Sequence, residues 1–351
     1  MIYINGKFLV QRKTGVQQFA TELTRQLIAS GLDITIVVPK TFKSVDAGIP
    51  DGMIAKTGIF SNLILWEQVD LFAYVKRNKK GLLLSFCNTG PLFIKNQVVC
   101  IHDMAFYKNP QWFSKLFYKY YMFLVPRLAR SVLHIITVSN FSKHEISEKL
   151  RLSTQNITII NNAPAAKYIV KEFDKINLQK DDFFLFVGSY DPRKNIQLLL
   201  KVFSLKEYSS LKLVIIGAPS KSFVKEEYTV PVNIEFITNC DDDTLAGYYR
   251  RARALINSSV YEGFGLPIIE AMASGCPLII SEIPPFVEIA RKNACYFNPH
   301  SIGSLKIALN RFLGKDGEQI IKDVQANYIR SFDFSWKVAA DDLSALIKKI
   351  S

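Results

Sequence analysis

Two glutamates eight positions apart bracket a glycine-rich turn in the second half of the sequence. The turn reads Tyr-Glu-Gly-Phe-Gly-Leu-Pro over residues 261–267; Glu262 lies inside it, and Glu270 lies in the helix expected to follow. Backbone N–H groups at such a turn and the positive end of the helix dipole attract an anion such as phosphate. Carboxylates accept hydrogen bonds from hydroxyl groups. The stretch therefore predicts a site for a ligand that carries phosphate and many hydroxyl groups.

Two adjacent cations, Arg193 and Lys194, follow a hydrophobic run at 183–187 and a turn that opens at Gly188. The run is expected to be a strand, and a helix containing residues 198–200 follows, so the cations emerge where parallel sheets bind ligands. Side chains of this kind can neutralise a diphosphate. A solvated surface loop is the simpler alternative, but the position after a glycine turn at a strand end favours binding.

A third pair of polar residues, His102 and Asp103, comes directly after the hydrophobic run at 98–101. A histidine beside an aspartate at a strand end can bind sugar hydroxyls or move a proton. A histidine whose ring is satisfied by the local backbone is an equally good interpretation. Gly15, at the start of the first amphipathic helix, permits close backbone approach, although one glycine there is as often structural as functional.

The acidic run Asp241-Asp242-Asp243 contains an Asp-x-Asp spacing that could bind a metal ion on a sugar diphosphate. It stands before a segment expected to be helical, 245–253, so capping and complementation of the helix dipole explain it more economically. No other group of histidines, cysteines and aspartates has metal-ligand spacing. We therefore expect neither a metal ion nor a cofactor.

Strands and helices alternate along the chain in two series, which predicts an α/β fold with parallel sheets. The first series begins with a strand at 1–5 and the second with the strand at 183–187; the periodicity fades between them, around 163–172. We therefore expect an N-terminal domain over 1–165 and a C-terminal domain over 166–334. The amphipathic segment 335–351 is expected to pack back on the first.

The composition favours a globular enzyme, because the chain has 351 residues, 49% hydrophobic and 21% charged. Its net charge of +13 is uneven: residues 1–165 hold 20 basic and 9 acidic side chains, and the remainder holds 24 and 22. The first half is therefore expected to face an anionic partner, either acidic lipid or nucleic acid, unless the bias reflects a generally basic proteome. The five scattered cysteines indicate buried thiols in a reducing compartment.

The stretch 107–130 interleaves aromatic and basic side chains, a pattern that suits a surface in contact with lipid headgroups and acyl chains. Aromatic residues at helical spacing are more often ordinary core, so both interpretations stay open. Neither a signal peptide nor an apolar run of the ~18 residues that span a bilayer is visible. We expect a cytoplasmic protein that is peripheral on the inner face of the cytoplasmic membrane.

The whole chain resembles the retaining glycosyltransferases of family 4, the group 1 glycosyltransferases. The most specific feature is the Glu-Gly-Phe-Gly-Leu-Pro run with Glu262 and Glu270 eight residues apart. Supporting pieces are Thr14-Gly15-Val16, Ile101-His102-Asp103, residues 137–142, residues 188–195 and Phe334-Ser335-Trp336. The resemblance implies the GT-B fold, in which two Rossmann-like domains face each other with a cleft between them. Within the family, the chain resembles the bacterial mannosyl- or rhamnosyltransferases of surface polysaccharide synthesis.

The resemblance also implies roles for single residues. Glu270 would bind the ribose hydroxyls of the donor nucleotide, and Glu262 would contact the hydroxyls of the transferred sugar. Arg193 and Lys194 would hold the diphosphate, with Gly15 approaching it from the other domain. His102 and Asp103 would lie over the sugar on the acceptor side. The turn residues expected to bind sugar or phosphate oxygens are Gly263, Phe264, Gly265 and Leu266.

The sequence departs from the family pattern at two positions. Many relatives carry an arginine directly after the glycine at Gly188, where this chain has Ser189, so Arg193 is a candidate substitute. The Pro-Asn-Gly often found near the linker reads Asn161-Asn162-Ala163. The implied reaction moves a hexose from a nucleotide-diphosphate sugar to a lipid-linked saccharide without a metal; GDP-mannose is the favoured donor and dTDP-rhamnose the next.

Two other functions remain as alternatives. A nucleotide-sugar epimerase of similar two-domain build would turn over the donor without an acceptor. A nucleic-acid-binding protein is suggested only by the sequence pI of about 9.4, and no recognised nucleic-acid motif supports it. We therefore expect a donor sugar nucleotide, a lipid-linked acceptor and an anionic membrane surface as partners, and no nucleic acid.

Overall fold

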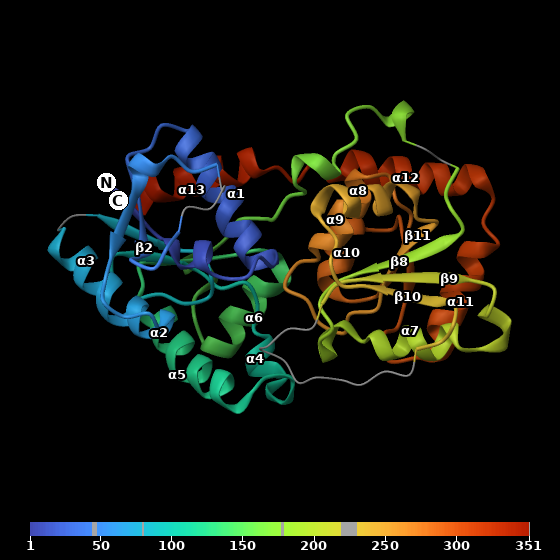
Figure 1. The fold of residues 1–351 in the computed structure, drawn as a ribbon, viewed down its shortest axis with the longest axis horizontal. Helices are drawn as coiled ribbons and strands as arrows, with labels where there is room; N and C mark the ends of the chain where they lie inside the picture. Colours follow the sequence, from blue (N-terminus) through green and yellow to red (C-terminus); the bar gives the residue numbers. More distant parts are fainter. Residues whose placement is uncertain (44–47, 79–80, 177–178, 219–229, 351) are drawn as a thin grey trace. The chain divides into compact units, whose positions relative to one another are not determined.

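The computed structural model describes residues 1–43, 48–78, 81–176, 179–218 and 230–350 (Figure 1). Contacts between residues divide the chain into two compact units, and each contains one sheet of parallel strands. Unit 1 comprises Met1–Tyr107, Tyr118–Asn162 and Ser335–Ser351, and unit 2 comprises Lys108–Phe117 and Ala163–Phe334.

The sheet of unit 1 has seven strands in the order β3-β2-β1-β4-β5-β6-β7. The central strands are buried apolar runs because helices cover both faces of a parallel sheet; Ile4 pairs with Ile36 on one side and Leu84 on the other. The strands are β1 (Ile2–Asn5), β2 (Ile34–Pro39), β3 (Ile54–Thr57), β4 (Leu82–Ser85), β5 (Gln97–Cys100), β6 (His134–Thr137) and β7 (Ile157–Ile159). The helices along this part of the chain are α1 (Gly15–Ala29), α2 (Leu63–Leu65), α3 (Phe72–Arg77), α4 (Ala105–Lys108), α5 (Lys115–Ser131), α6 (Asn140–Leu150) and α13 (Trp336–Ile350).

The sheet of unit 2 has six strands in the order β10-β9-β8-β11-β12-β13. Its core is built by apolar side chains of β8, α7 and α11, among them the fully buried Phe186, Leu199 and Leu309. The strands are β8 (Phe183–Val187), β9 (Lys212–Ile216), β10 (Ile234–Ile237), β11 (Ala254–Asn257), β12 (Leu278–Ser281) and β13 (Cys295–Phe297). The helices are α7 (Ile196–Phe203), α8 (Asp242–Arg251), α9 (Leu266–Ala273), α10 (Pro284–Ala290), α11 (Ile302–Leu313) and α12 (Gly317–Ser331).

The expected α/β class is confirmed, and both sheets have the strand order of a Rossmann fold. In each sheet the chain first adds strands on one side of the first strand and then crosses to its other side. The crossing lies between β1 and β4 in unit 1 and between β8 and β11 in unit 2. Ligands of open parallel sheets bind at the carboxyl ends of the strands beside such a crossing.

The end of the chain returns to unit 1. Helix α13 packs on α1, and the ring of Trp336 lies edge-on to the fully buried Phe19 with centroids 5.9 Å apart. Residue 351, the last of the segment expected to pack back, lies outside the described residues. Among the described residues, no helix combines the length and the apolar composition needed to cross a bilayer.

One short segment of the part expected to form the N-terminal domain, 1–165, belongs to the other unit. Residues 108–117 belong to unit 2 although the sequence on either side of them belongs to unit 1. The reason is local packing: the Lys108 ammonium lies 5.5 Å from the ring centroid of Tyr261, and the Trp112 ring lies edge-on to the same ring at 6.4 Å. The excursion therefore covers the residue directly before Glu262.

Candidate functional site

The two loops that carry the expected donor residues are adjacent in unit 2. They follow β8 and β11, which pair in parallel with Ala254 opposite Phe184. The loops are also tied together directly, since Val260 N donates to the Arg193 carbonyl at 2.8 Å and Ser258 Oγ donates to the Lys194 carbonyl at 2.9 Å. The crossing point of the sheet thus brings residues 188–195 and 258–265 into one site.

The loop after β8 orients Arg193 through a buried aspartate. Asp191 is fully buried; its Oδ1 accepts from Arg193 Nε at 3.2 Å, and its Oδ2 accepts from Ser189 Oγ at 2.5 Å. The residue after β9, Gly217, leaves room for this loop, because a Cβ at that position would lie 1.8 Å from the Gly188 carbonyl oxygen. Ser189 therefore helps to fix the carboxylate that holds Arg193.

Glu262 is the centre of a buried charged cluster. Its Oε1 accepts from Lys194 Nζ and lies 2.9 Å from Ser259 Oγ, and its Oε2 accepts from a terminal nitrogen of Arg193 at 3.4 Å. Glu262 and Lys194 are 7% and 6% exposed, so this ion pair is shielded from water. The site joins one carboxylate to two cations from the neighbouring loop.

The electrostatics of the cluster keep Glu262 ionised. Burial alone would raise the pKa of its carboxyl group, but the charges of Lys194 and Arg193 outweigh that effect and hold the pKa below its usual value. The sequence prediction treated the cations as diphosphate ligands and Glu262 as a separate sugar ligand. In the structure the three side chains are ion-paired with one another.

The turn and the helix that follow have the predicted form. Gly265 adopts a φ of 132°, a conformation that strongly favours glycine, and α9 begins at Leu266 with Pro267 in its first turn. Phe264 is buried against Phe334, with ring centroids 5.7 Å apart. The turn that contains Gly263 thus leads directly into a helix N-terminus beside Glu262, which is the arrangement expected at an anion site.

Glu270 lies one turn into α9 and is 4% exposed. Its Oε2 accepts a hydrogen bond of 2.9 Å from the hydroxyl of Tyr249 on α8. The two glutamates of the motif therefore have different environments: Glu262 pairs with cations, and Glu270 is held by a neutral tyrosine.

His102 belongs to unit 1 and follows β5. It is buried, its Nε2 lies 2.8 Å from the Phe86 carbonyl, and its backbone N–H donates to Asn88 Oδ1 at 2.8 Å. Burial lowers the pKa of His102 to about 4, although the hydrogen bond to Phe86 opposes this shift. A carbonyl can only accept, so Nε2 carries the proton and Nδ1 is the acceptor nitrogen of a neutral ring. The local backbone thus satisfies one of the two ring nitrogens, Nε2, which agrees with the interpretation of a histidine bonded by the local backbone.

Asp103 and Gly15 occupy the starts of two helices in unit 1. Asp103 Oδ1 accepts from the backbone N–H of Ala105 at 2.9 Å, which caps α4. Gly15 is the first residue of α1. Both lie after strands of the sheet on its carboxyl side, where the prediction put them. Of the residues expected to bind the donor, Gly15 lies in unit 1 with His102 and Asp103, and the others lie in unit 2.

The acidic run is a helix cap. Asp241 Oδ1 accepts from the backbone N–H groups of Asp243 and Thr244, at 3.0 and 2.8 Å, at the start of α8. These hydrogen bonds lower the pKa of Asp241. The part of the chain that the structure describes contains no group of three or more histidine, cysteine, aspartate or glutamate residues suited to a metal ion.

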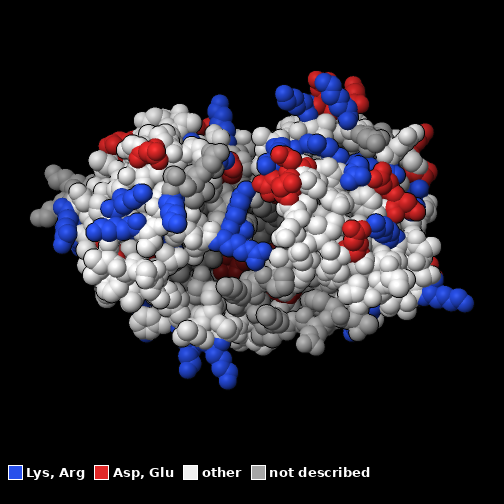
Figure 2. Space-filling model, in the orientation of Figure 1, with Lys and Arg blue, Asp and Glu red and all other residues white. Residues whose placement is uncertain are grey.

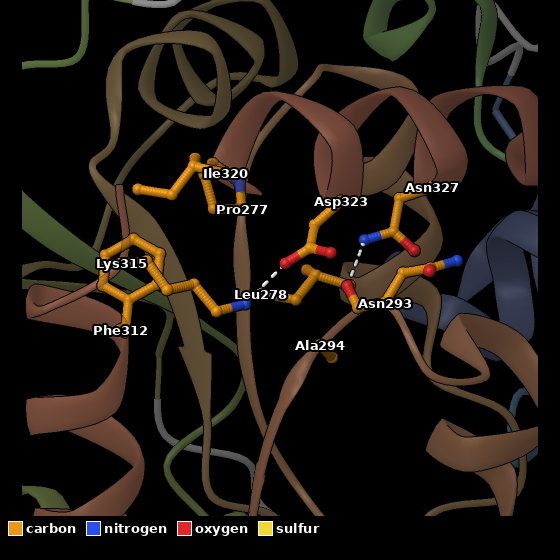
Figure 3. Close-up of a pocket in the computed structure, with 9 residues that line it drawn as sticks. All are labelled: Pro277, Leu278, Asn293, Ala294, Phe312, Lys315, Ile320, Asp323 and Asn327. Carbon is orange, nitrogen blue, oxygen red and sulfur yellow. Dashed lines mark hydrogen bonds and ion pairs between the residues drawn. The ribbon is translucent and has the colours of Figure 1, made fainter. Parts of the chain in front are cut away.

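A small pocket in unit 2 lies away from these residues. It is at the amino end of β12, next to Pro277 and Leu278, and Figure 3 shows the Lys315–Asp323 ion pair and Asn327 on its wall. Asn327 donates to the Asn293 carbonyl at 2.7 Å. The expected ligand residues follow the carboxyl ends of β8 and β11, so this pocket is not part of the candidate site.

Sequence reasoning missed three residues that shape the site: Asp191, Ser259 and Tyr249. Asp191 stands two positions before Arg193, so its proximity could have suggested an ion pair. Ser259 is three positions before Glu262, within a recognisable turn. Tyr249 lies on another helix, 21 positions from Glu270, and no spacing in the sequence indicated its contact.

Comparison with known proteins identifies the family of this two-unit α/β chain. Residues 169–328 match the family described as Glycosyl transferases group 1, and residues 13–163 match Glycosyltransferase Family 4. The chain is 29% identical to the O-antigen chain mannosyltransferase RfbU of Salmonella typhimurium, over 74% of this chain and 72% of that protein. It is 25% identical to the O-antigen chain mannosyltransferase B of Escherichia coli, over 71% and 70%.

Solved structures show the same fold. The sucrose-phosphate synthase of Thermosynechococcus elongatus superposes with a TM-score of 0.73 at 17% identity, covering 100% of this chain and 99% of that one. WaaG, a glycosyltransferase involved in lipopolysaccharide biosynthesis, gives a TM-score of 0.70 at 12% identity, covering 99% and 98%. The fold is the GT-B fold of two Rossmann-like domains. The chain belongs to the group 1 glycosyltransferases of family 4.

Proposed function

We propose that this glycosyltransferase moves a hexose from a nucleotide-diphosphate sugar to a lipid-linked saccharide during synthesis of a bacterial surface polysaccharide such as O-antigen, capsule or exopolysaccharide. GDP-mannose is the favoured donor and dTDP-rhamnose the next. The names of the relatives RfbU and mannosyltransferase B, both O-antigen chain mannosyltransferases, support the polysaccharide and the mannosyl group. Unit 2 would bind the donor and unit 1 the acceptor.

The observation that carries this proposal is the cluster of Glu262 with Arg193 and Lys194 at the crossing point of the unit 2 sheet. A donor diphosphate is an anion that can take over the hydrogen bonds of the two cations. Glu262 would then accept from hydroxyls of the sugar, and Glu270 from hydroxyls of the ribose. Because Asp191 already orients Arg193, Arg193 would supply the charge that an arginine at the Ser189 position supplies in many relatives.

The proposed chemistry is retaining and independent of a metal. The bond between the sugar C1 and the phosphate oxygen breaks, and C1 bonds to the acceptor oxygen on the same face. The acceptor proton passes to the departing phosphate. Negative charge grows on the diphosphate, so the fixed positive charges of Arg193 and Lys194 and the start of α9 would stabilise the transition state. In this scheme Glu262 orients the sugar and does not attack C1.

In unit 1 we assign the acceptor side to His102 and Asp103. A neutral His102 with its proton on Nε2 offers Nδ1 as an acceptor to a sugar hydroxyl. It is unsuited to donate a proton from Nε2, which is bound to Phe86. Gly15 would let the backbone approach the diphosphate. These three assignments rest on the family resemblance together with the positions of the residues at the ends of strands.

We also propose that unit 1 docks on anionic lipid at the cytoplasmic face of the membrane. Large apolar side chains stand exposed on three neighbouring segments of this unit: Leu65 (47%), Val69 (46%), Phe93 (72%) and Phe123 (54%). The segments adjoin, since Leu92 N donates to Gln68 Oε1 and Ser131 Oγ to the Leu92 carbonyl. We call these four residues the apolar face.

Cations stand next to the apolar face. The Arg127 guanidinium lies 4.1 Å from the ring centroid of Phe123, and the Lys76 ammonium lies 5.9 Å from that of Phe72. In Figure 2, basic side chains project from the lower and left margins of unit 1, whereas acidic and basic side chains are interspersed over unit 2. Part of the stretch 107–130 is nevertheless core, since Phe113, Leu124 and Leu128 are buried.

Membership of a glycosyltransferase family favours transfer over the two alternatives, epimerisation and nucleic-acid binding. An NMR time course separates them. The protein is incubated with GDP-mannose or dTDP-rhamnose, with and without octyl glycosides as soluble acceptors. We expect a new glycoside, with the anomeric configuration of the donor, only when an acceptor is present. Conversion of the donor sugar without an acceptor would establish the epimerase, and a gel shift with nucleic acid at physiological salt would support the third function.

A further inference from the structure

A buried glutamate, Glu67, lies at the crossing point of the unit 1 sheet. Its Oε1 is contacted by three donors: Lys7 Nζ at 2.7 Å, Asn5 Nδ2 at 2.8 Å and Thr89 Oγ1 at 3.1 Å. Asn5 ends β1, Lys7 lies in the 3-10 helix directly after it, and Thr89 follows β4. We call these four residues the Glu67 cluster. The donors therefore come from both strands that flank the crossing, at the edge where open parallel sheets bind ligands.

The second oxygen of this carboxylate has a different environment. Among the residues that the structure describes, none donates a hydrogen bond to Glu67 Oε2, although this oxygen is buried and the residue is 0% exposed. A buried carboxylate oxygen without a donor costs free energy, and most buried polar atoms in proteins have a partner. The side chain also lies in the π-helical turn Trp66–Leu71, a local form that occurs frequently at functional sites. Glu67 thus offers one acceptor atom that the described side chains leave open.

Two tyrosines of α5, Tyr120 and Tyr121, stand beside Glu67, and both are partly exposed. Burial, and after it the charge of Glu67, raises the pKa values of the two phenols, so both keep their protons close to the carboxylate. The charge of Asp103 contributes to the same rise at Tyr121. Tyr121 therefore lies near both Glu67 and Asp103, one of the residues assigned to the acceptor side.

The charges around Glu67 Oε2 favour a neutral hydroxyl group over an ion. Lys7 already balances the charge of Glu67, so an anion would be repelled by the carboxylate oxygen and a cation by the neighbouring ammonium group. A hydroxyl group donates one hydrogen bond and brings no charge. The Glu67 cluster therefore suits one hydroxyl group of a saccharide.

We propose that Glu67 Oε2 accepts a hydrogen bond from a hydroxyl group of the acceptor saccharide, which makes the Glu67 cluster an acceptor subsite of unit 1. This inference rests on the proposed function, which assigns the acceptor to unit 1. It adds a specificity-determining residue at the strand crossing to His102 and Asp103, which follow the next strand, β5. The hydroxyl group would approach beside the partly exposed Tyr120 and Tyr121. An acceptor without that hydroxyl would leave the buried oxygen unpaired, and such sites discriminate strongly against the deoxy analogue.

The decisive variant is Glu67→Gln. The three donors on Oε1 require an acceptor, so they hold the amide oxygen there and put the amide NH2 group in the place of Oε2. The variant thus replaces the open acceptor by a donor of the same shape. The double variant Lys7→Met/Glu67→Gln removes both charges and serves where thermal melts show that the single variant has lost its fold. Glu22→Gln is the matched control, because Glu22 is a glutamate of α1 that also pairs with a cation, Arg25, at 3.0 Å.

The measurement is NMR titration of the full chain with octyl α-D-mannopyranoside and its monodeoxy analogues, which gives a dissociation constant for each protein and ligand. We expect the wild type and Glu22→Gln to bind one deoxy analogue about tenfold more weakly than the parent glycoside. Glu67→Gln should reduce that ratio to about twofold and leave the ratios of the other analogues unchanged, because an amide bonds to the hydroxyl group without the charge of a carboxylate.

Equal weakening of all the glycosides in Glu67→Gln would show that the glutamate only supports packing, which overturns the proposal. Wild-type ratios in that variant would show that Oε2 meets a trapped water molecule and no ligand, which overturns it as well. In both cases the glycosyltransferase function would stand, since the time course with donor and acceptor measures it separately. Absence of binding by every glycoside would contradict both the inference and the acceptor role proposed for unit 1.

Discussion

At the carboxyl edge of unit 2, Glu262 forms ion pairs with Arg193 and Lys194, whereas at the same edge of unit 1 the neutral ring of His102 is bound to the Phe86 carbonyl. In unit 2 the partners of the carboxylate are side chains from an adjacent loop. In unit 1 the partners of His102 are a backbone carbonyl and the side chain of Asn88. The same strand order therefore supports two different kinds of polar site.

Unit 1 also contains a buried ion pair, and it has a different setting. Lys7 Nζ lies 2.7 Å from Glu67 Oε1, and that oxygen also accepts from Asn5 and Thr89. Glu67 is fully buried and lies in a π-helical turn, Trp66–Leu71. This pair links the 3-10 helix Gly6–Val10, directly after β1, to that π-helical turn. By contrast, the Glu262 cluster lies beside a helix N-terminus and a glycine turn, which suit an incoming anion.

We expect the carboxyl edges of the two sheets to have different roles in the reaction. At the edge of unit 2, Glu262 neutralises the charges of Arg193 and Lys194, and a diphosphate can replace Glu262 as the partner of these cations. The residues of this edge should therefore govern donor binding and the stabilisation of the leaving group. The edge of unit 1 is uncharged at His102, so its residues there should act by hydrogen bonding and packing.

Replacement of Lys194 by methionine should reduce the transfer rate about 1,000-fold, because the variant loses a cation at the leaving diphosphate and leaves Glu262 with weaker compensation. The measurement is kcat with saturating donor. Lys201→Met is the matched control, since Lys201 is exposed on the next helix, α7. If Lys194→Met retained wild-type kcat, the cluster would have no part in catalysis.

The stability of unit 1 should depend on pH through His102. Its pKa of about 4 lies below the ordinary histidine value of 6.5, so the stabilisation is complete above pH 6.5 and is lost as the pH falls from 6.5 towards 4. The loss should reach about 3 kcal/mol of unfolding free energy. Urea unfolding of the wild type and His102→Phe between pH 7 and 4.5 measures it. Parallel pH dependence in the two proteins would show that His102 is not the buried neutral group described above.

Glu262→Gln should lower kcat/KM about 10- to 100-fold, because the amide cannot accept from sugar hydroxyls with both of its terminal atoms. Donor binding should weaken less than catalysis. Abolished transfer with intact donor binding would instead give Glu262 a direct catalytic role. The variant should also remove an acid sensitivity: the pKa of Glu262 is depressed, so its stabilisation is lost as the pH falls below the ordinary value near 4.5.

The smallest effect is expected on the apolar face of unit 1. Phe123→Ser should weaken binding to vesicles rich in phosphatidylglycerol several-fold, since it removes one of four exposed apolar side chains. Ile329→Ser, a change at a 60% exposed side chain of unit 2, should leave binding unchanged. Co-sedimentation at low and high salt measures both. Equal binding of wild type to neutral and acidic vesicles would contradict the proposed docking.

The fold was largely predictable because its signals are local. Continuous apolar runs such as Phe183–Val187 indicated buried parallel strands, and the glycine turn with Pro267 indicated the start of a helix, now seen at Leu266. The cap at Asp241 was likewise predicted and is confirmed. Each of these signals lies within a few residues of the feature that it forms.

The contacts that complete the site were less predictable because they join distant parts of the sequence. Tyr249 reaches Glu270 only because α8 packs on α9, and Glu262 meets Lys194 across 68 positions because β8 and β11 pair. The excursion of residues 108–117 into unit 2 had no sequence signal either. In each case the partner is set by strand order and helix packing, which spacing along the chain does not encode.

The central claim is that the charged edge of unit 2 binds the donor diphosphate. A crystal structure of the protein with GDP-mannose tests it most directly. We predict diphosphate oxygens within hydrogen-bonding distance of Arg193 and Lys194, with the ribose hydroxyls on Glu270. A nucleotide bound elsewhere, with the three side chains of the Glu262 cluster still paired to one another, would contradict the account.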